Sequence, residues 1–285
     1  PGFTAAGRSA INYNPWKENL VERLDRLIGQ RKCKEAILVI ADCFTAYGGS
    51  QYINSSATGR YEDHVITELV PFIDDKLATF RSPGGRAVMG KSSGGFGALT
   101  LGMRRPDVFG HVVSHSGDMF FELGYALDFP KFVNALGRHG GSPEKFVKAF
   151  LASRDKEGFA HAAINTIAMA ACYSPSPRTR LGFDLPCDAR TGEIVPGVWR
   201  RWKRLDPVEA ACAHKSNLKK LRTLFFDAGR RDEFFLHLGA RKLSDTLKRL
   251  GVKHIYEEHE RGHFDMAARC DRSLALLTSR LRDLR

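Results

Sequence analysis

The sequence lacks several features that would define a protein class at once. No apolar run approaches the roughly 18 residues that a membrane-spanning helix needs. It contains no internal repeat, no low-complexity tract, no metal-ligand spacing and no phosphate-binding glycine loop. We therefore expect a protein without a membrane span, a metal or a cofactor.

The cysteines also lack a pattern. They form no C-x-x-C pair and no framework spacing, which is typical of reduced thiols in a cytosolic protein. We expect a cytoplasmic location. A periplasmic or secreted location stays open, because the sequence begins at Pro1 and does not show whether a signal peptide precedes it. The six cysteines are Cys33, Cys43, Cys172, Cys187, Cys212 and Cys270.

Acidic residues are few compared with basic ones. The chain of 285 residues has 44 lysines and arginines against 32 aspartates and glutamates, a formal net charge of +12. The excess is spread along the chain, with one dense cluster at Arg200–Arg204. Such a cluster is typical of a nucleic-acid patch or of a solvated basic face. We favour the solvated face and expect no nucleic-acid partner.

Short apolar runs alternate with helical patterns at both ends of the chain. This alternation predicts an α/β fold: an open, mostly parallel sheet with helices on both faces. Residues 118–205 lose the alternation, so we interpret them as a cap or lid inserted into a single domain whose core is 1–117 and 206–285. The predicted strands are 36–41, 86–90, 111–114, 221–226 and 252–256, and the predicted helices are 16–29, 60–80 with a break at Pro71, 94–103, 234–250 and one from about 265.

The most informative stretch follows the second apolar run. Gly90-Lys91-Ser92-Ser93-Gly94 fits G-x-S-x-G, the strand–turn–helix elbow that presents a serine nucleophile. A turn this sharp strains the serine backbone, and side chains at the flanking glycines would collide with strand and helix. The helix N-terminus beside Ser92 would stabilise a developing oxyanion. The alternative is a glycine-rich turn that only packs a helix on a sheet.

A serine needs a base to take its proton and an acid to orient that base. The acid is expected after a late strand, where Asp227, Asp232 and Glu233 follow the run at 221–226. We favour Asp232, because a turn through Gly229 would carry it to the active edge, and keep the other two carboxylates as alternatives.

The base is expected after the next strand, where the candidates are His259 and His263. His263 stands in a loop before the last helix, whereas His259 lies in a charged run and is expected to be solvated. His115 precedes both expected partners in the chain, and this order argues against it as the base.

The motifs around Ser92, Asp232 and His263 resemble those of one known family. With the segments 104–109 and 114–117, the sequence resembles the "Putative esterase" family of α/β-hydrolases, which includes esterase D (S-formylglutathione hydrolase), enterochelin-esterase-like proteins and mycolyltransferases. The resemblance covers most of residues 1–117 and 206–285. It implies the α/β-hydrolase fold, with Ser92 as nucleophile, Asp232 as acid and His263 as base.

The beginning of the chain joins this resemblance. Pro1-Gly2-Phe3-Thr4 resembles the family's His-Gly-x-Thr loop, which implies the backbone amides of Phe3 and Ser93 as the oxyanion hole. Pro1 replaces the usual His, and Ala5 stands where glutathione-thioester hydrolases tend to carry Cys, so we do not expect a glutathione thioester as substrate.

The same resemblance implies that the first three strands of the family's fold are missing from this sequence. The strands predicted at 36–41 and 86–90 would then have unpaired inner edges. We expect the natural protein to extend before Pro1, or another segment or chain to fill this gap.

The residues around the elbow supply candidates for the substrate pocket: Lys91 beside the serine, and Gln51, Tyr52 and Asn54 in the long loop after the first apolar run. The predicted function is a serine carboxylesterase that acts on a small or medium ester through an acyl-enzyme. The alternatives are acyl transfer to a sugar or lipid acceptor and an inactive hydrolase scaffold used for binding. A homodimer also stays open.

Overall fold

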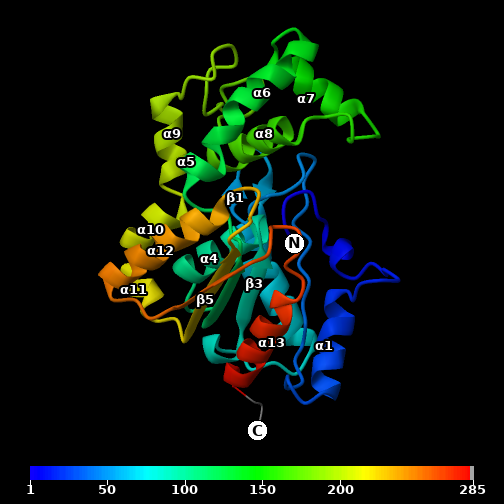
Figure 1. The fold of residues 1–285 in the computed structure, drawn as a ribbon, viewed down its shortest axis with the longest axis vertical. Helices are drawn as coiled ribbons and strands as arrows, with labels where there is room; N and C mark the ends of the chain where they lie inside the picture. The colour runs from blue at the N-terminus through cyan, green and yellow to red at the C-terminus, as the bar shows by residue number, and fades with distance from the viewer. Residues whose placement is uncertain (283–285) are drawn as a thin grey trace.

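A four-stranded parallel sheet forms the centre of the computed structural model, which describes residues 1–282 (Figure 1). The strand order follows the chain, and neighbouring strands are in direct register, with Val88 opposite Val112 and Val112 opposite Leu224. This confirms the predicted open parallel sheet. The strands are β3 (Ala87–Lys91), β4 (His111–His115), β5 (Thr223–Gly229) and β6 (Ile255–His259).

Helices cover both faces of the sheet, as predicted. Successive side chains of a strand point to opposite faces. Val112 packs among residues of α4 (Ser93–Arg104) and α12 (Leu236–Leu250). Val113 instead packs against α13 (Arg269–Arg280), which in turn contacts α1 (Leu20–Gly29). Figure 1 shows α12 on one side of the sheet and α1 with α13 on the other.

The remaining elements lie before the sheet and between β4 and β5. A short hairpin, β1 (Asn54–Ser55) with β2 (Gly59–Arg60), leads into α2. The other helices are α2 (Tyr61–Asp63), the π-helical segment His64–Leu69, α3 (Val70–Lys76), α5 (Phe121–Gly124), α6 (Phe129–Leu136), α7 (Pro143–Ala152), α8 (His161–Tyr173), α9 (Pro196–Lys203), α10 (Pro207–Ala213) and α11 (Lys215–Leu218).

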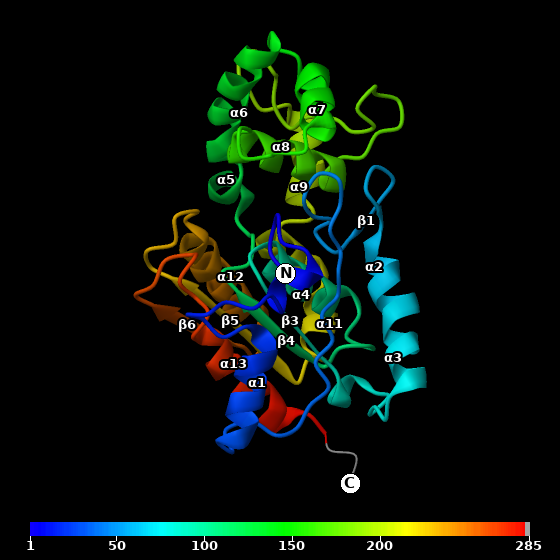
Figure 2. The same cartoon turned by 90° about the vertical axis from the view of Figure 1, so that its right-hand side faces the viewer.

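Helices α5 to α9 form a separate layer beyond the end of the sheet where β3 meets α4 (Figures 1 and 2). An aromatic core holds this layer together, and Phe96 of α4 and Ile53 belong to the same core. The layer is therefore packed directly onto the turn between β3 and α4. Its fully buried aromatic side chains include Phe121, Phe129, Phe132, Phe146, Phe183 and Trp202.

The strand predicted at 36–41 is wrong. This segment is irregular, and Ile37 and Val39 are about half exposed (48% and 42%). A strand needs a hydrogen-bonding neighbour, and among the described residues β3 pairs only with β4. The apolar run therefore has no ladder to join. Leu38 packs against α1 and α13, and Ala41 packs against a cluster that includes Leu101 of α4.

The first helix begins later than predicted. It starts at Leu20 because Asn19 caps it: the Asn19 side chain accepts from the amide of Glu22, and the Glu22 side chain accepts from the amide of Asn19. Trp16 lies before the helix and is 90% exposed. No break occurs at Pro71: helical backbone continues to Lys76, and the π-helical segment His64–Leu69 changes to the α-helix Val70–Lys76 directly before this proline.

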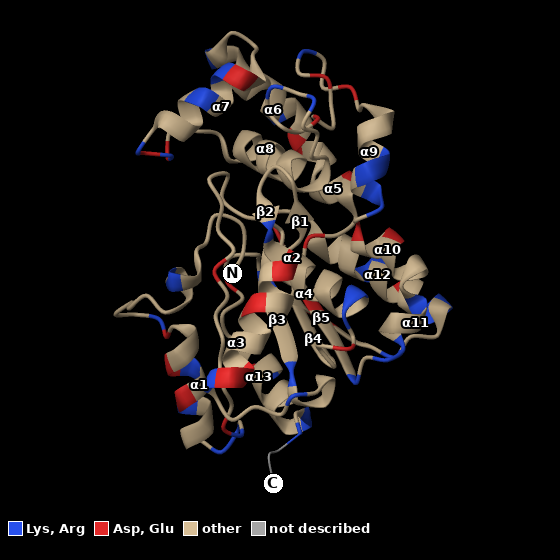
Figure 3. Ribbon diagram, turned by 180° about the vertical axis from the view of Figure 1, so that it is seen from behind, with Lys and Arg blue, Asp and Glu red and all other residues tan. Residues whose placement is uncertain are grey.

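The basic cluster at 200–204 lies mostly on α9 (Figure 3). Arg201 pairs with Asp184, and Lys203 contacts Glu122 at 2.5 Å. Trp202 is buried. All six cysteines are free thiols, as expected. Within residues 1–282, each helix is too short or too polar to cross a bilayer.

Candidate active site

Ser92 occupies the strained turn that its motif predicts. It joins β3 to α4 with φ 57° and ψ −125°, in the left-handed region that non-glycine residues rarely adopt. The amide of Ser92 donates to the carbonyl of His115 at 2.9 Å. A Cβ at Gly90 would lie 2.2 Å from the carbonyl oxygen of Gly94, so only glycine fits at position 90.

The beginning of the chain lies against this turn. A Cβ at Gly2 would be 3.4 Å from Cβ of Ser92, and the carbonyl of Pro1 accepts from the Tyr52 hydroxyl at 2.7 Å. The next residue, Phe3, packs its ring against Gly48 and edge-on to His161. Gly2 and Ser92 are thus in contact. Phe3 and Ser93, which are expected to supply the oxyanion amides, are the residues that follow them in the chain.

His263 and Asp232 form a buried hydrogen-bonded pair. The distance from Nδ1 of His263 to Oδ2 of Asp232 is 2.9 Å, and the side chains are 5% and 0% exposed. Burial raises the pKa of the Asp232 carboxyl, but the hydrogen bond and charge of His263 outweigh it and place this pKa below its ordinary value of 3.8. With Nδ1 donating to Asp232, Nε2 is left as the proton acceptor.

The two alternative acids have other partners. Glu233 accepts the backbone amide of His263 at 2.6 Å, so it holds the same loop through the main chain. Asp227 lies inside β5 and bonds His115. His259, expected to be solvated, is instead half-buried at the end of β6, and its Nε2 is buried without a hydrogen-bond partner among residues 1–282. Of these groups, only Asp232 bonds the His263 ring.

The structure brings Ser92 and the His263–Asp232 pair to the same edge of the sheet, but no hydrogen bond joins Ser92 to His263 within residues 1–282. Oγ of Ser92 instead lies 3.4 Å from Oδ1 of Asp118. Catalytic hydrogen bonds are often long or misaligned before substrate binds. Asp118 does not belong to any of the sequence motifs used to predict the site. The signal that could have found it is its position directly after a strand, at the edge of the sheet where Ser92 lies.

The predicted pocket residues separate into two groups. Lys91 lies half-buried with its ammonium 5.6 Å from the centre of the Phe264 ring. Burial lowers its pKa, while the charges of Asp232, Cys270 and Glu233 act in the opposite direction.

Gln51 is fully buried and Tyr52 holds Pro1, so both pack behind the turn. Asn54 is exposed and bonds Asp63 at 2.9 Å, not a residue of the turn.

A cleft of about 230 Å³ lies beside the acid–base pair, between α5 to α8 and the segment after Asp232. His161 connects the two sides, since its ring lies 5.9 Å from that of Phe234, and the Phe234 ring lies 4.9 Å from that of His263. Phe234 therefore separates this cleft from the His263 ring, and neither Ser92 nor His263 lines it. Its lining includes Leu123, Leu127, Lys131, His161, Phe234 and Phe235.

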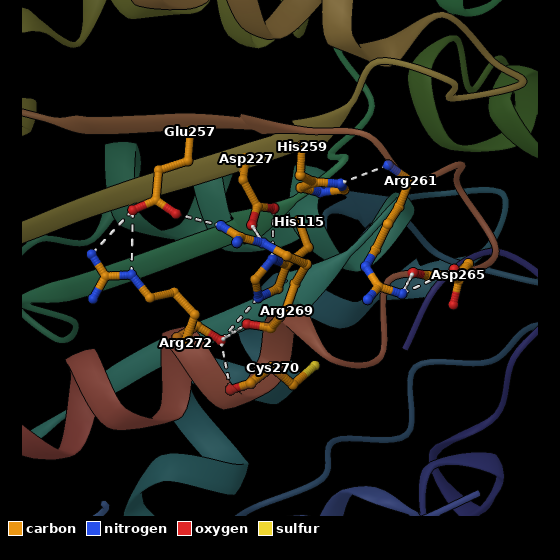
Figure 4. A network of polar contacts seen from close by, with 10 residues as sticks. His115, Asp227, Glu257, His259, Arg261, Asp265, Arg269, Cys270 and Arg272 are labelled. Carbon is orange, nitrogen blue, oxygen red and sulfur yellow. Dashed lines mark hydrogen bonds and ion pairs between the residues drawn. The ribbon is translucent and has the colours of Figure 1, made fainter.

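His115 of β4 and Asp227 of β5 (Figure 4) form a second Ser–His–Asp arrangement with Ser273 of α13. His115 contacts Asp227 at 2.7 Å and Ser273 at 2.9 Å, and Arg269 donates to Asp227 at 2.7 Å. Exposures of 2% for His115, 1% for Asp227 and 0% for Ser273 close this arrangement to any substrate. It joins α13 to β4 and β5, and the carbonyl of His115 accepts the Ser92 amide, so its role is to support the turn.

No group of three histidine, cysteine, aspartate or glutamate side chains in residues 1–282 is arranged to hold a metal ion. At this edge the structure brings together the Ser92 hydroxyl, the His263–Asp232 pair and the Asp118 carboxylate.

A family model matches most of this chain, and two known proteins match about a third of it. The family model described as "Putative esterase" matches residues 17–263. The uncharacterized protein YbbA of Bacillus subtilis is 24% identical over 123 residues, which are 37% of this chain and 46% of YbbA. The endo-1,4-beta-xylanase/feruloyl esterase of Xylanibacter ruminicola is 33% identical over 97 residues, 34% of this chain and 13% of that protein. Each match spans less than half of the relative.

One solved structure with a similar fold is the fluorophosphonate-binding serine hydrolase FphF of Staphylococcus aureus. It has a TM-score of 0.56 and 15% identity, with 97% of this chain and 80% of that chain covered. At this identity the likeness concerns the fold alone. The parallel sheet with helices on both faces is the α/β-hydrolase fold, as predicted.

Proposed function

Since this chain belongs to the Putative esterase family, we propose that it hydrolyses carboxylic esters through an acyl-enzyme on Ser92. The observation that carries the proposal is the left-handed turn at Ser92, between the loop of Gly2 on one side and the start of α4 on the other. Backbone strain of this kind persists only where the surrounding structure imposes it, and it is concentrated at functional sites.

The reaction assigns one role to each group. The Ser92 hydroxyl turns from Asp118 toward His263, and its oxygen attacks the ester carbonyl while Nε2 of His263 takes the proton. Asp232 keeps Nδ1 protonated and stabilises the imidazolium. The backbone amides of Phe3 and Ser93 donate to the oxyanion of the tetrahedral intermediate.

The intermediate collapses when the carbon–oxygen bond to the alcohol breaks and His263 protonates the leaving oxygen. This leaves an ester between the acyl group and Ser92. A water molecule then attacks that carbonyl, His263 takes its proton, and the returning proton releases Ser92 with the free acid. The helical insertion would act as the cap that limits which esters reach Ser92.

The cleft suggests the size of the substrate. Its volume of about 230 Å³ and its apolar side chains, including Leu123 and Phe234, fit one small aromatic or branched aliphatic group. The name of the Xylanibacter relative includes feruloyl esterase. We therefore propose a small or medium ester, with an aromatic acyl group as the first class to test.

The test is hydrolysis of p-nitrophenyl acetate by the chain, with Ser92→Ala and Ser273→Ala compared under the same conditions. Loss of the nucleophile should lower kcat at least about 10³-fold. Ser273 has the same kind of histidine neighbour but is sealed, so its variant should stay within about threefold. Equal activity of native protein and Ser92→Ala would refute the proposal. If the folded native protein does not hydrolyse the ester, acyl transfer or a binding scaffold would be favoured.

A further inference from the structure

A buried carboxylate that the proposed reaction does not use lies directly behind Ser92. Asp118 is 7% exposed and follows the end of β4 by three residues. Its Oδ1 is 3.4 Å from Oγ of Ser92, and its Oδ2 accepts from Oγ of Ser93 at 3.1 Å. One carboxylate therefore contacts both residues at the centre of the turn.

The same carboxylate connects the turn to the rest of the site. Oδ2 of Asp118 also accepts from the Tyr125 hydroxyl at 2.8 Å and from Nε2 of Gln51 at 3.1 Å. Behind them, the Tyr173 hydroxyl lies 3.2 Å from that of Tyr125 and 2.8 Å from Nε2 of Gln51. Tyr125 and Tyr173 belong to the helical insertion, and Gln51 to the loop before β1.

This arrangement is expensive to bury. The side chains that hydrogen-bond Asp118 in the described residues are all neutral, so its lost hydration is replaced by neutral donors. Gln51 and Tyr52 also adopt left-handed backbone conformations, with φ 54° and 57°. A packed apolar side chain would fill the same space at lower cost. An apolar side chain, however, would not provide the directional hydrogen bonds that a carboxylate makes.

We propose that Asp118 is a positioning residue, which fixes Ser93, the first residue of α4, and with it the backbone turn at Ser92, relative to the helical insertion. This rests on the proposed role of Ser92. Because Ser93 is also the proposed oxyanion donor, a shift at the start of α4 moves the nucleophile and the oxyanion site together. Asp118 acts through these two residues, so its loss changes the rate of the chemical step more than the binding of the ester.

The test compares Asp118→Ala with Asp118→Asn. An asparagine can direct its oxygen to Ser93 and Tyr125 and its NH₂ group to Ser92, so it keeps the contacts without the charge. We expect the alanine variant to lose about 30- to 100-fold in kcat, as for a small misplacement of reacting groups, with KM within about threefold. The asparagine variant should stay within about fivefold of the native kcat.

Tyr125→Phe and Tyr173→Phe form a matched pair that remains informative if Asp118→Ala does not fold. Both lose one buried hydroxyl of the same cluster, but only Tyr125 bonds Asp118. We expect a three- to tenfold loss of kcat for Tyr125→Phe and none for Tyr173→Phe. The rate of Ser92 phosphonylation by a fluorophosphonate should fall in parallel with kcat.

Three results would overturn the positioning role. They are a folded Asp118→Ala variant within threefold of the native kcat, an asparagine variant as impaired as the alanine variant, and equal effects of the two tyrosine variants. Full activity of Ser92→Ala would instead show that the proposed function fails, whatever the Asp118 variants do.

Discussion

Replacing Asp232 by asparagine changes a single atom of the proposed acid–base pair. Oδ2 of Asp232 accepts from Nδ1 of His263 at 2.9 Å, and Oδ1 accepts the backbone amide of Phe234 at 2.9 Å. The asparagine oxygen can keep the bond to the amide of Phe234, which leaves its NH₂ group facing Nδ1. His263 then has to carry its proton on Nε2, where it blocks the uptake of a proton from Ser92.

The expected loss is large, because the imidazole is in the wrong tautomer and the imidazolium lacks its counter-charge. A change of this kind in a serine–histidine–aspartate site lowers kcat about 10⁴-fold. We therefore expect Asp232→Asn to lower kcat for p-nitrophenyl acetate by about 10³- to 10⁴-fold near pH 7.5. Circular dichroism and the melting temperature should show that the variant remains folded.

Glu233→Gln is the matched control. Glu233 is the next residue and accepts the backbone amide of His263 at 2.6 Å, but does not bond the ring. A glutamine oxygen can accept the same amide, so kcat should stay within about fivefold. Equal losses in the two variants, or an Asp232→Asn variant within tenfold of native activity, would refute the assignment of Asp232 as the acid.

Two other predictions concern the support of the turn. Burial raises the pKa of the Asp227 carboxyl, but the bonds from His115 and Arg269 outweigh burial and place this pKa below 3.8. The ionised carboxylate therefore stabilises the fold fully when the pH is above the pKa that Asp227 has in the unfolded chain. This stabilisation is lost as the pH falls through the lower pKa of the folded state. Asp227→Asn should therefore lower the melting temperature at pH 7 and approach the native value near pH 2, and a difference that is constant with pH would contradict this. Gly90→Ala should abolish activity, because the new Cβ would lie 2.2 Å from the carbonyl oxygen of Gly94. Gly137→Ala is the control: a Cβ there has no neighbour within 4 Å, so kcat should be unchanged. Steady-state kinetics of the two variants would test this.

The parts of the fold that local pattern determines were predictable from the sequence. The glycines around Ser92 indicated the strand–turn–helix geometry because the turn itself requires them. Asp232 and His263 follow neighbouring parallel strands, whose carboxyl ends meet at one edge of the sheet. Their pairing could therefore be expected, although 31 residues separate them.

Features that depend on distant partners were not predictable. The run at 36–41 has the composition of a buried strand, but a strand also needs a neighbour, and the described residues supply none. Gln51 was expected to line a pocket and is instead buried beside Asp118, because residues of α8 close over it. The contacts of Asp118 with Gln51 and Tyr125 join segments that no spacing in the sequence relates.

The most direct measurement of the central claim is the identification of the residue that a fluorophosphonate labels covalently. The protein would be treated with a fluorophosphonate, digested and analysed by mass spectrometry to find the modified residue. We predict one phosphonyl group per chain, on the peptide that contains Ser92, and none after Ser92→Ala. A label on any other residue, such as Ser273, or unchanged labelling of Ser92→Ala would contradict the account.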